Sequence, residues 1–67
     1  MNTSFERGKN EGAEINPQDG SLQEWEQIYQ EEMQGIPDIA KKDPVLASEH
    51  SEYMQGWIKG ARELYHR

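Results

Sequence analysis

The sequence predicts an all-α protein: an antiparallel helix hairpin preceded by a flexible or short-helical N-terminal segment. Three observations support this class. Apolar residues recur at spacings of three and four in two segments. A helix-start signal precedes each of these segments. No segment alternates apolar and polar residues with the period of two that marks a strand. The predicted organisation is an N-terminal segment over residues 1–20 and a hairpin domain over residues 21–67.

The N-terminal segment is rich in glycine, asparagine and charged residues, and besides Met1 its only large apolar residues are Phe5 and Ile15. Such a segment buries too little apolar surface to offset its ordering entropy alone. We therefore expect it to be flexible, or to form a short helix over residues 4–11 that settles only on another surface. The residues at 16–20, Asn-Pro-Gln-Asp-Gly, predict a turn or linker.

The first long helix is expected over residues 22–34. Ser21 and Glu24 have the spacing of a capping box, in which a hydroxyl and a carboxylate satisfy free backbone donors. Gly35 is a common helix end and Pro37 disfavours continuation, so the helix is expected to stop at Gln34. Its apolar face consists of Leu22, Trp25, Ile28, Tyr29 and Met33.

The second long helix is expected from Asp43 to His66. An aspartate cap followed by Pro44 at the first helical position is a strong start signal, and Ser48 is an alternative cap one turn later. The short connection over residues 35–42 favours an antiparallel arrangement. The apolar stripe of this helix consists of Leu46, Tyr53, Met54, Trp57, Ile58, Ala61, Leu64 and Tyr65.

Two helices enclose only a thin core. A domain of about this size buries roughly 60% of the surface that its unfolded chain exposes. Trp25 and Trp57 each offer about 150–250 Å² of surface to bury. Closing both apolar stripes is easier with a third helix or a second subunit, so we expect a homodimer with a four-helix arrangement.

Composition excludes several classes of function. The chain has 13 acidic and 7 basic residues and a formal charge of −6. This balance disfavours direct binding to DNA or to an anionic membrane and favours a protein partner with a basic surface; the alternative is a solvated surface that only confers solubility. With no cysteine, neither a disulfide nor a cysteine zinc site is expected. No apolar run approaches the ~20 residues of a membrane span, and residues 1–9 lack a signal-peptide core, so a cytoplasmic protein is expected.

The most specific pattern is an internal repeat. Residues 5–13 and residues 53–61 share the order aromatic-x-x-Gly-x-x-x-Gly-Ala. A glycine inside a helix costs about 1 kcal/mol relative to alanine, so its presence needs a reason. Gly56 and Gly60 lie one turn apart and form a groove that another backbone or an aromatic ring can approach. Two interpretations follow: a docking groove for a partner, or intramolecular packing against Trp25 or Phe5.

The same residues resemble a known family. Phe5-x-x-Gly8-x-x-x-Gly12 followed by Asn-Pro at 16–17, and later Tyr53-x-x-Gly56-Trp-x-x-Gly-Ala, is similar to the small bacterial ribosome modulation factors. The resemblance covers roughly 25 residues and implies two helices, a glycine-bearing first one and a second with aromatic-x-x-Gly-Trp. It also implies a ribosome-associated role. The chain departs from the family in its additional helix at 22–34 and in its acidic charge, whereas the best-known member is basic.

Catalytic and metal-binding patterns are weak. His50 lies between Glu49 and Ser51, but neighbours along a helix point in different directions, and only residues three or four apart meet. A metal site needs at least three converging ligands, and His66 lies near the end of the chain. We therefore expect no catalytic residues, no metal and no cofactor, and a protein that is not an enzyme.

The sequence therefore predicts a small acidic regulatory or inhibitory protein that docks on a macromolecular partner with a basic, nucleic-acid-handling surface. The alternatives are a ribosome-associated factor of the modulation type and a structural subunit of a homo-oligomer. The proposed docking surface combines the glutamates of the first long helix with the aromatic and glycine face of the second. These partner-binding residues are Glu24, Glu26, Glu31, Glu32, Tyr53, Gly56, Trp57, Gly60 and Tyr65.

Overall fold

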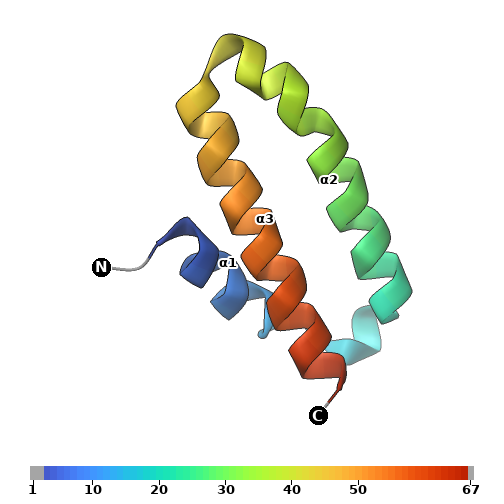
Figure 1. The fold of residues 1–67 in the computed structure, drawn as a ribbon. Helices are drawn as coiled ribbons and strands as arrows, with labels where there is room; N and C mark the ends of the chain where they lie inside the picture. Colours follow the sequence, from blue (N-terminus) through green and yellow to red (C-terminus); the bar gives the residue numbers. More distant parts are fainter. Residues whose placement is uncertain (1–2, 67) are drawn as a thin grey trace.

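The computed structural model describes residues 3–66, and its regular elements are all helical (Figure 1). Helix α1 spans Ser4–Gly12, the 3₁₀ turn η1 spans Pro17–Asp19, α2 spans Leu22–Lys42 and α3 spans Pro44–Tyr65. No strand occurs within residues 3–66. The prediction of an all-α class is therefore confirmed, with three helices.

Side-chain caps define where the helices begin. The Ser21 hydroxyl accepts a hydrogen bond from the backbone N–H of Glu24 at 3.2 Å, and Asp43 accepts one from the N–H of Leu46 at 3.1 Å. Each cap satisfies one of the four backbone donors that lack an intrahelical partner at a helix start. Both predicted starts are confirmed, and Ser48, the alternative start, lies inside α3.

The predicted end of the first long helix at Gln34 is wrong. Helix α2 continues through Gly35 and Pro37 to Lys42, eight residues further. Pro37 has no N–H, so the carbonyl of Met33 loses its intrahelical donor. The helix continues nevertheless because its apolar periodicity continues. The half-buried residues beyond Gly35 are Ile36, Ile39 and Ala40.

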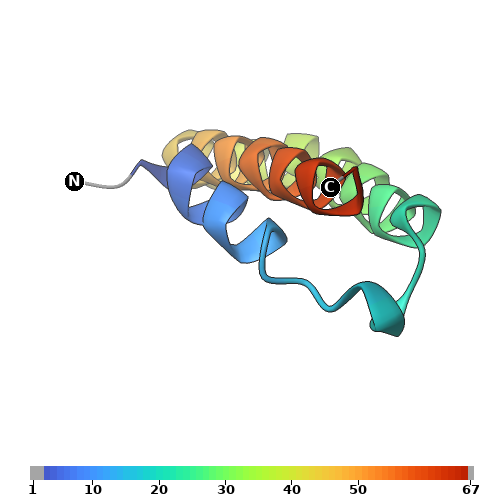
Figure 2. The same cartoon turned by 90° about the horizontal axis from the view of Figure 1, so that it is seen from below.

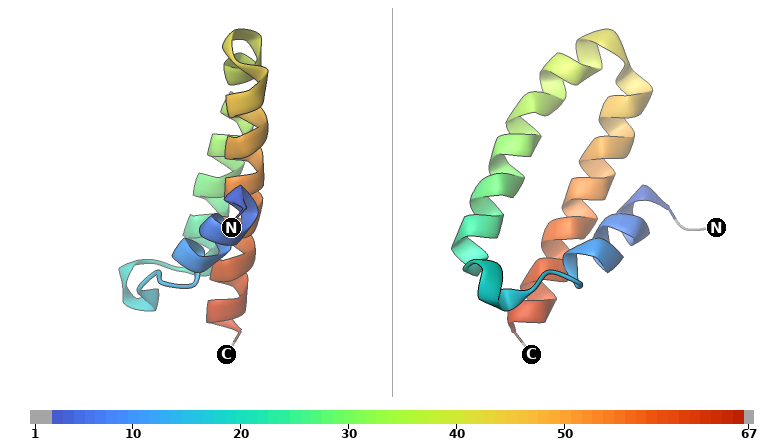
Figure 3. Two further views of the ribbon diagram at one scale, coloured as in Figure 1. Left: turned by 90° about the vertical axis from the view of Figure 1, so that its left-hand side faces the viewer. Right: turned by 180° about the vertical axis from the view of Figure 1, so that it is seen from behind.

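The connection predicted over residues 35–42 is helical in the structure, and Asp43 alone joins the two long helices. Asp43 is both the C-cap of α2 and the N-cap of α3. Its backbone is extended, with φ −151° and ψ 93°, which breaks the helical path at a single residue. As a result α2 and α3 run in opposite directions from this point (Figure 3).

The three helices form a layer about one helix thick. Helix α3 contacts α1 on one side and α2 on the other, and the layer is seen edge-on in Figure 2. The Cα atoms extend 37 × 28 × 14 Å, with a radius of gyration of 12.3 Å. A compact domain of this length would have a radius of about 11 Å. Both faces of the layer are therefore close to solvent.

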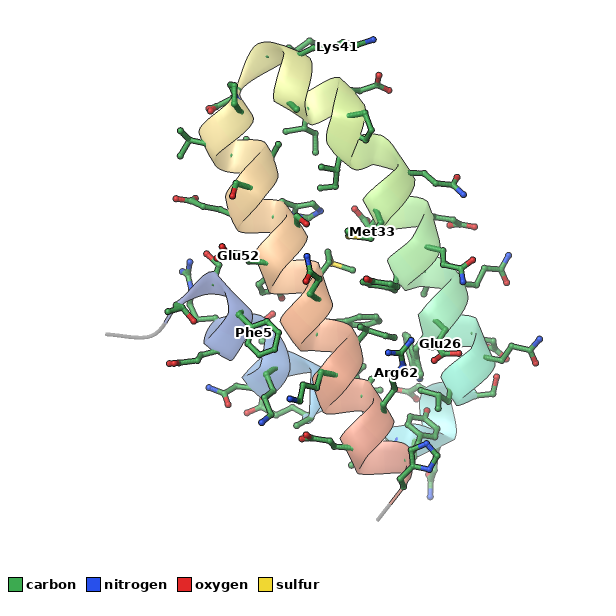
Figure 4. The ribbon with its side chains drawn as sticks, in the orientation of Figure 1. Phe5, Glu26, Met33, Lys41, Glu52 and Arg62 are labelled. Carbon is green, nitrogen blue, oxygen red and sulfur yellow. The ribbon has the colours of Figure 1, made fainter. Side chains whose placement is uncertain are left out.

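Within residues 3–66 the buried apolar residues come from α3 alone: Ala47, Met54, Ile58 and Ala61. From α2, Met33 points toward α3 (Figure 4). Trp25 of α2 meets Trp57 of α3 edge to face, with ring centroids 6.1 Å apart and planes at 79°. This geometry is the favourable one for aromatic pairs. None of the helices within residues 3–66 has the length and apolar character needed to cross a membrane.

Candidate functional site

The repeated glycine pattern forms the interface between α1 and α3. A Cβ atom built on Gly8 would lie 2.8 Å from the carbonyl carbon of Tyr53, and closer still to its oxygen. A Cβ atom on Gly56 would lie 2.8 Å from the carbonyl carbon of Phe5, again closer to the oxygen. Real Cβ atoms essentially never approach other heavy atoms this closely. Only glycine allows the two backbones to touch here.

The second pair of glycines repeats this arrangement one turn later. Gly12 faces the carbonyl of Trp57, and Gly60 faces the carbonyl of Lys9. The contacts are reciprocal. The first glycine of each copy of the pattern faces the aromatic residue of the other copy, and the second glycine faces the residue that follows the other copy's first glycine. Residues further along α1 meet residues further along α3, so the two helices run in the same general direction where they cross. In glycine the Cβ direction holds a Cα hydrogen, which here points at a carbonyl oxygen, as in other closely packed helix pairs.

Polar contacts flank the glycine interface on both sides. The hydroxyl of Tyr53 donates to the carboxylate of Glu11, and Lys9 lies 3.8 Å from the carboxylate of Glu63. The Lys59 ammonium lies 5.9 Å from the centre of the Phe5 ring. The interface therefore has a backbone centre and a polar rim.

The interface between α1 and α3 covers the glycine face that the sequence predicted as a docking surface. Gly56 and Gly60 are buried against α1, while Tyr53 and Trp57 are half-buried beside them. The sequence left two interpretations of the groove. The contact of Gly56 with the backbone of Phe5 favours the second one, intramolecular packing. A partner would reach the glycines only after α1 had moved away.

Tyr65 also has an intramolecular role. Its hydroxyl accepts a hydrogen bond from the indole N–H of Trp25 at 2.7 Å and donates one to the carbonyl of Gly20 at 2.5 Å. These bonds join the end of α3, the start of α2 and the linker between α1 and α2. The phenol of Tyr65 is half-buried.

Of the four predicted glutamates of α2, two have a partner on α3 and two are exposed without one among residues 3–66. Glu26 forms an ion pair with Arg62 of α3 at 2.8 Å, and the two side chains point toward one another in Figure 4. Glu32 lies 3.1 Å from the imidazole Nε2 of His50. Glu24 and Glu31 are exposed and have no cationic partner within ion-pair distance among residues 3–66. The structure therefore does not bring the four carboxylates together on one face.

An open hollow of about 230 Å³ lies where α1 meets the first half of α3. We call it the α1–α3 hollow. The imidazole of His50 stacks on the ring of Tyr53, with centroids 6.5 Å apart and planes at 14°. Leu46, which the sequence placed in the apolar stripe, is 52% exposed here. The lining residues are Ser4, Arg7, Glu11, Leu46, Glu49, His50 and Tyr53.

Sequence reasoning missed this hollow because its two walls come from opposite ends of the chain. The repeated pattern contained the necessary signal, since two helices with the same glycine spacing are natural partners for each other. In the hollow, His50 has a carboxylate of α2 as its partner and no serine within hydrogen-bond distance. No cluster of three or more potential metal ligands occurs among residues 3–66.

The residues that carry the resemblance to the ribosome modulation factors, including Gly8, Gly12, Gly56 and Gly60, thus meet in one interface. Membership of that family stays a prediction. No family model, curated protein or solved structure matches the chain.

Proposed function

We propose that this chain is a small, acidic, non-enzymatic binding protein of the cytoplasm that modulates or inhibits a macromolecular partner by docking. The partner is a nucleic-acid-handling protein with a basic surface. The docking unit is the antiparallel hairpin of α2 and α3, with α1 packed on α3. The observation that carries the proposal is the outward face of α2, where Glu24 and Glu31 are exposed and unpaired among the described residues.

Helical register supports this role for the outward face. Glu24, Glu31 and Asp38 follow each other at intervals of seven residues, so they lie along one side of α2. Asp38 is balanced by Lys41 at 3.8 Å, which leaves the other two carboxylates to dominate the local potential. Exposed charges at the edge of an interface raise the association rate when the partner carries the opposite sign. Their effect falls steeply with salt.

A charge-reversal experiment tests the proposal. The tagged chain is incubated with nuclease-treated native lysate at low and moderate salt, and association rates are then measured with the retained basic protein. We expect Glu24→Lys with Glu31→Lys to slow association at least tenfold and to remove its salt dependence. The control, Glu6→Lys with Glu52→Lys, changes net charge equally at two other exposed positions. Equal effects of the two double variants, or no effect of either, would reject the steering role.

The second candidate is a ribosome-associated protein of the modulation type. It is favoured by the direct pairing of α1 with α3 through the residues that carry the family resemblance. This function predicts that the chain sediments with ribosomal subunits in spite of its charge, and that Gly56→Ala or Trp57→Ala abolishes sedimentation. Gly35→Ala is the control, since a Cβ at Gly35 meets nothing within 4 Å. A chain that stays in the supernatant at low salt argues against this function.

The third candidate is a structural subunit that completes a homo-oligomer. It is favoured by the thin layer of helices, since no large side chain among residues 3–66 is less than 2% exposed. Light scattering of the purified chain tests it directly. A stable dimer that recovers no other protein from lysate supports it, and a monomer at micromolar concentration excludes it.

A further inference from the structure

The α1–α3 hollow combines an exposed apolar side chain with an acidic rim. Leu46 is 52% exposed at the hollow, although it lies on α3, the helix that supplies the buried apolar side chains of the described residues. Glu11 and Glu49 line the hollow together with one cation, Arg7. His50 also lines the hollow, and its ring is held between Tyr53 and α2.

Helix α2 extends this surface on the other side of α3. The bond between Glu32 and His50 places Glu32 beside the hollow. Ile28 lies one turn before Glu32 on the same side of α2 and is 40% exposed. The face therefore presents two exposed apolar side chains, Leu46 on α3 and Ile28 on α2.

Charge on this face has a definite sign. Three carboxylates, those of Glu11, Glu32 and Glu49, surround it, against the single guanidinium of Arg7. These three carboxylates and one guanidinium give the face a net charge of −2. A ligand that covers the apolar residues must therefore carry positive charge at its edges.

The size of the hollow indicates what enters it. Sites for free small molecules usually measure about 300–1,000 Å³, and this hollow of about 230 Å³ is smaller and open. It suits a single anchoring side chain of a larger ligand. No strand edge is available within residues 3–66 for an extended peptide, whereas the surface between packed helices suits an amphipathic helix.

We propose that the α1–α3 hollow is the anchor site for a basic amphipathic helix of the partner protein. One large apolar side chain of that helix enters the hollow beside Leu46, and a second contacts Ile28. Its lysine or arginine residues face Glu49 and Glu32. This inference rests on the proposed function, because it specifies which segment of a basic partner binds and where.

The test uses the full chain and a synthetic probe, an 18-residue helical peptide with leucine on one face and lysine on the other. A matched peptide has glutamate in place of each lysine. In an NMR titration we expect the lysine peptide to shift the amide signals of Leu46, His50 and Tyr53, and the glutamate peptide to leave them unchanged. Leu46→Asp should weaken binding at least tenfold.

Val45→Asp is the matched control. Val45 is the adjacent residue, is 69% exposed and lies outside the hollow, so both variants add one charge to an exposed position in the first turn of α3. Equal weakening by the two variants, equal binding of the two peptides, or shifts confined to other surfaces would overturn the inference. A Leu46-dependent dimer in light scattering that excludes the peptide would assign the hollow to a second copy instead.

The two proposals fail separately. If lysate capture does not depend on Glu24 and Glu31 while the lysine peptide still binds at Leu46, only the steering role is rejected. If capture remains salt-dependent while Leu46→Asp has no effect on either ligand, only the anchor site is rejected.

Discussion

Alanine in place of Gly56 tests the α1–α3 interface most directly. The new Cβ would lie 2.8 Å from the carbonyl carbon of Phe5 and 2.9 Å from the amide nitrogen of Lys9. Both neighbours are backbone atoms of a helix, so neither can turn aside as a flexible side chain would. The helices must separate instead, and a gap of about 0.5–1 Å already forfeits a quarter to a half of the dispersion energy at a contact.

The expected change in the free energy of unfolding for Gly56→Ala follows from two opposing effects. Alanine raises the helix propensity of α3 by about 1 kcal/mol. Overpacking a close contact costs about 1–3 kcal/mol, and occasionally more. Helix α1 has nine residues and is too short to persist without its surface, so we expect it to detach and unfold. The balance is a loss of about 0–2 kcal/mol in the free energy of unfolding.

Gly35→Ala provides the matched control in the other long helix. Nothing lies within 4 Å of its added Cβ, so the propensity gain of about 1 kcal/mol should appear alone. Urea unfolding followed by circular dichroism should separate the two variants by about 1–3 kcal/mol. Hydrogen exchange should show lost protection in Ser4–Gly12 for Gly56→Ala only. If Gly56→Ala stabilised the chain as Gly35→Ala does, the backbone contact between α1 and α3 would be refuted.

Three further predictions concern single contacts. Pro37→Ala restores a donor for the carbonyl of Met33 and should stabilise the chain by about 2 kcal/mol in urea unfolding; an unchanged midpoint would mean that α2 does not continue past this residue. Tyr65→Phe leaves an indole donor and a linker carbonyl without their partner, so thermal unfolding should show a loss of about 1–3 kcal/mol, and a neutral change would exclude both bonds. A double-mutant cycle with Arg62→Ala and Glu26→Ala should give a coupling of about 0.2–1 kcal/mol that 1 M salt reduces; zero coupling at low salt would mean that the pair does not form.

Local signals were sufficient to predict where the long helices begin. Ser21 and Asp43 each cap a helix through a side chain, and such bonds involve residues two or three positions apart. The end of α2 was not predictable in the same way. Gly35 and Pro37 disfavour a helix locally, and the apolar residues that extend α2 as far as Lys42 gain their stability only against α3.

The candidate site shows the same difference between local and distant information. The glycine pattern at 53–61 indicated a close approach, but only the fold shows that the copy at 5–13 fills the groove. Likewise, the spacing of Glu26 and Glu32 could not reveal that each has a cationic or imidazole partner on α3. Pairings between helices depend on crossing geometry, which a single sequence does not encode in its local spacing.

The glycine interface has a further consequence for the register of α1 on α3. Its close contacts repeat every turn, so a shift of α1 by one turn would again place a glycine opposite a carbonyl of α3. Such a shift would keep only one glycine of each helix in the interface and place a residue with a side chain at the other close contact, so the glycines themselves disfavour it. The bond from Tyr53 to Glu11 and the pair of Lys9 with Glu63 do not repeat, and a one-turn shift would break both. These rim contacts, individually weak, favour the same alignment that the glycine spacing requires.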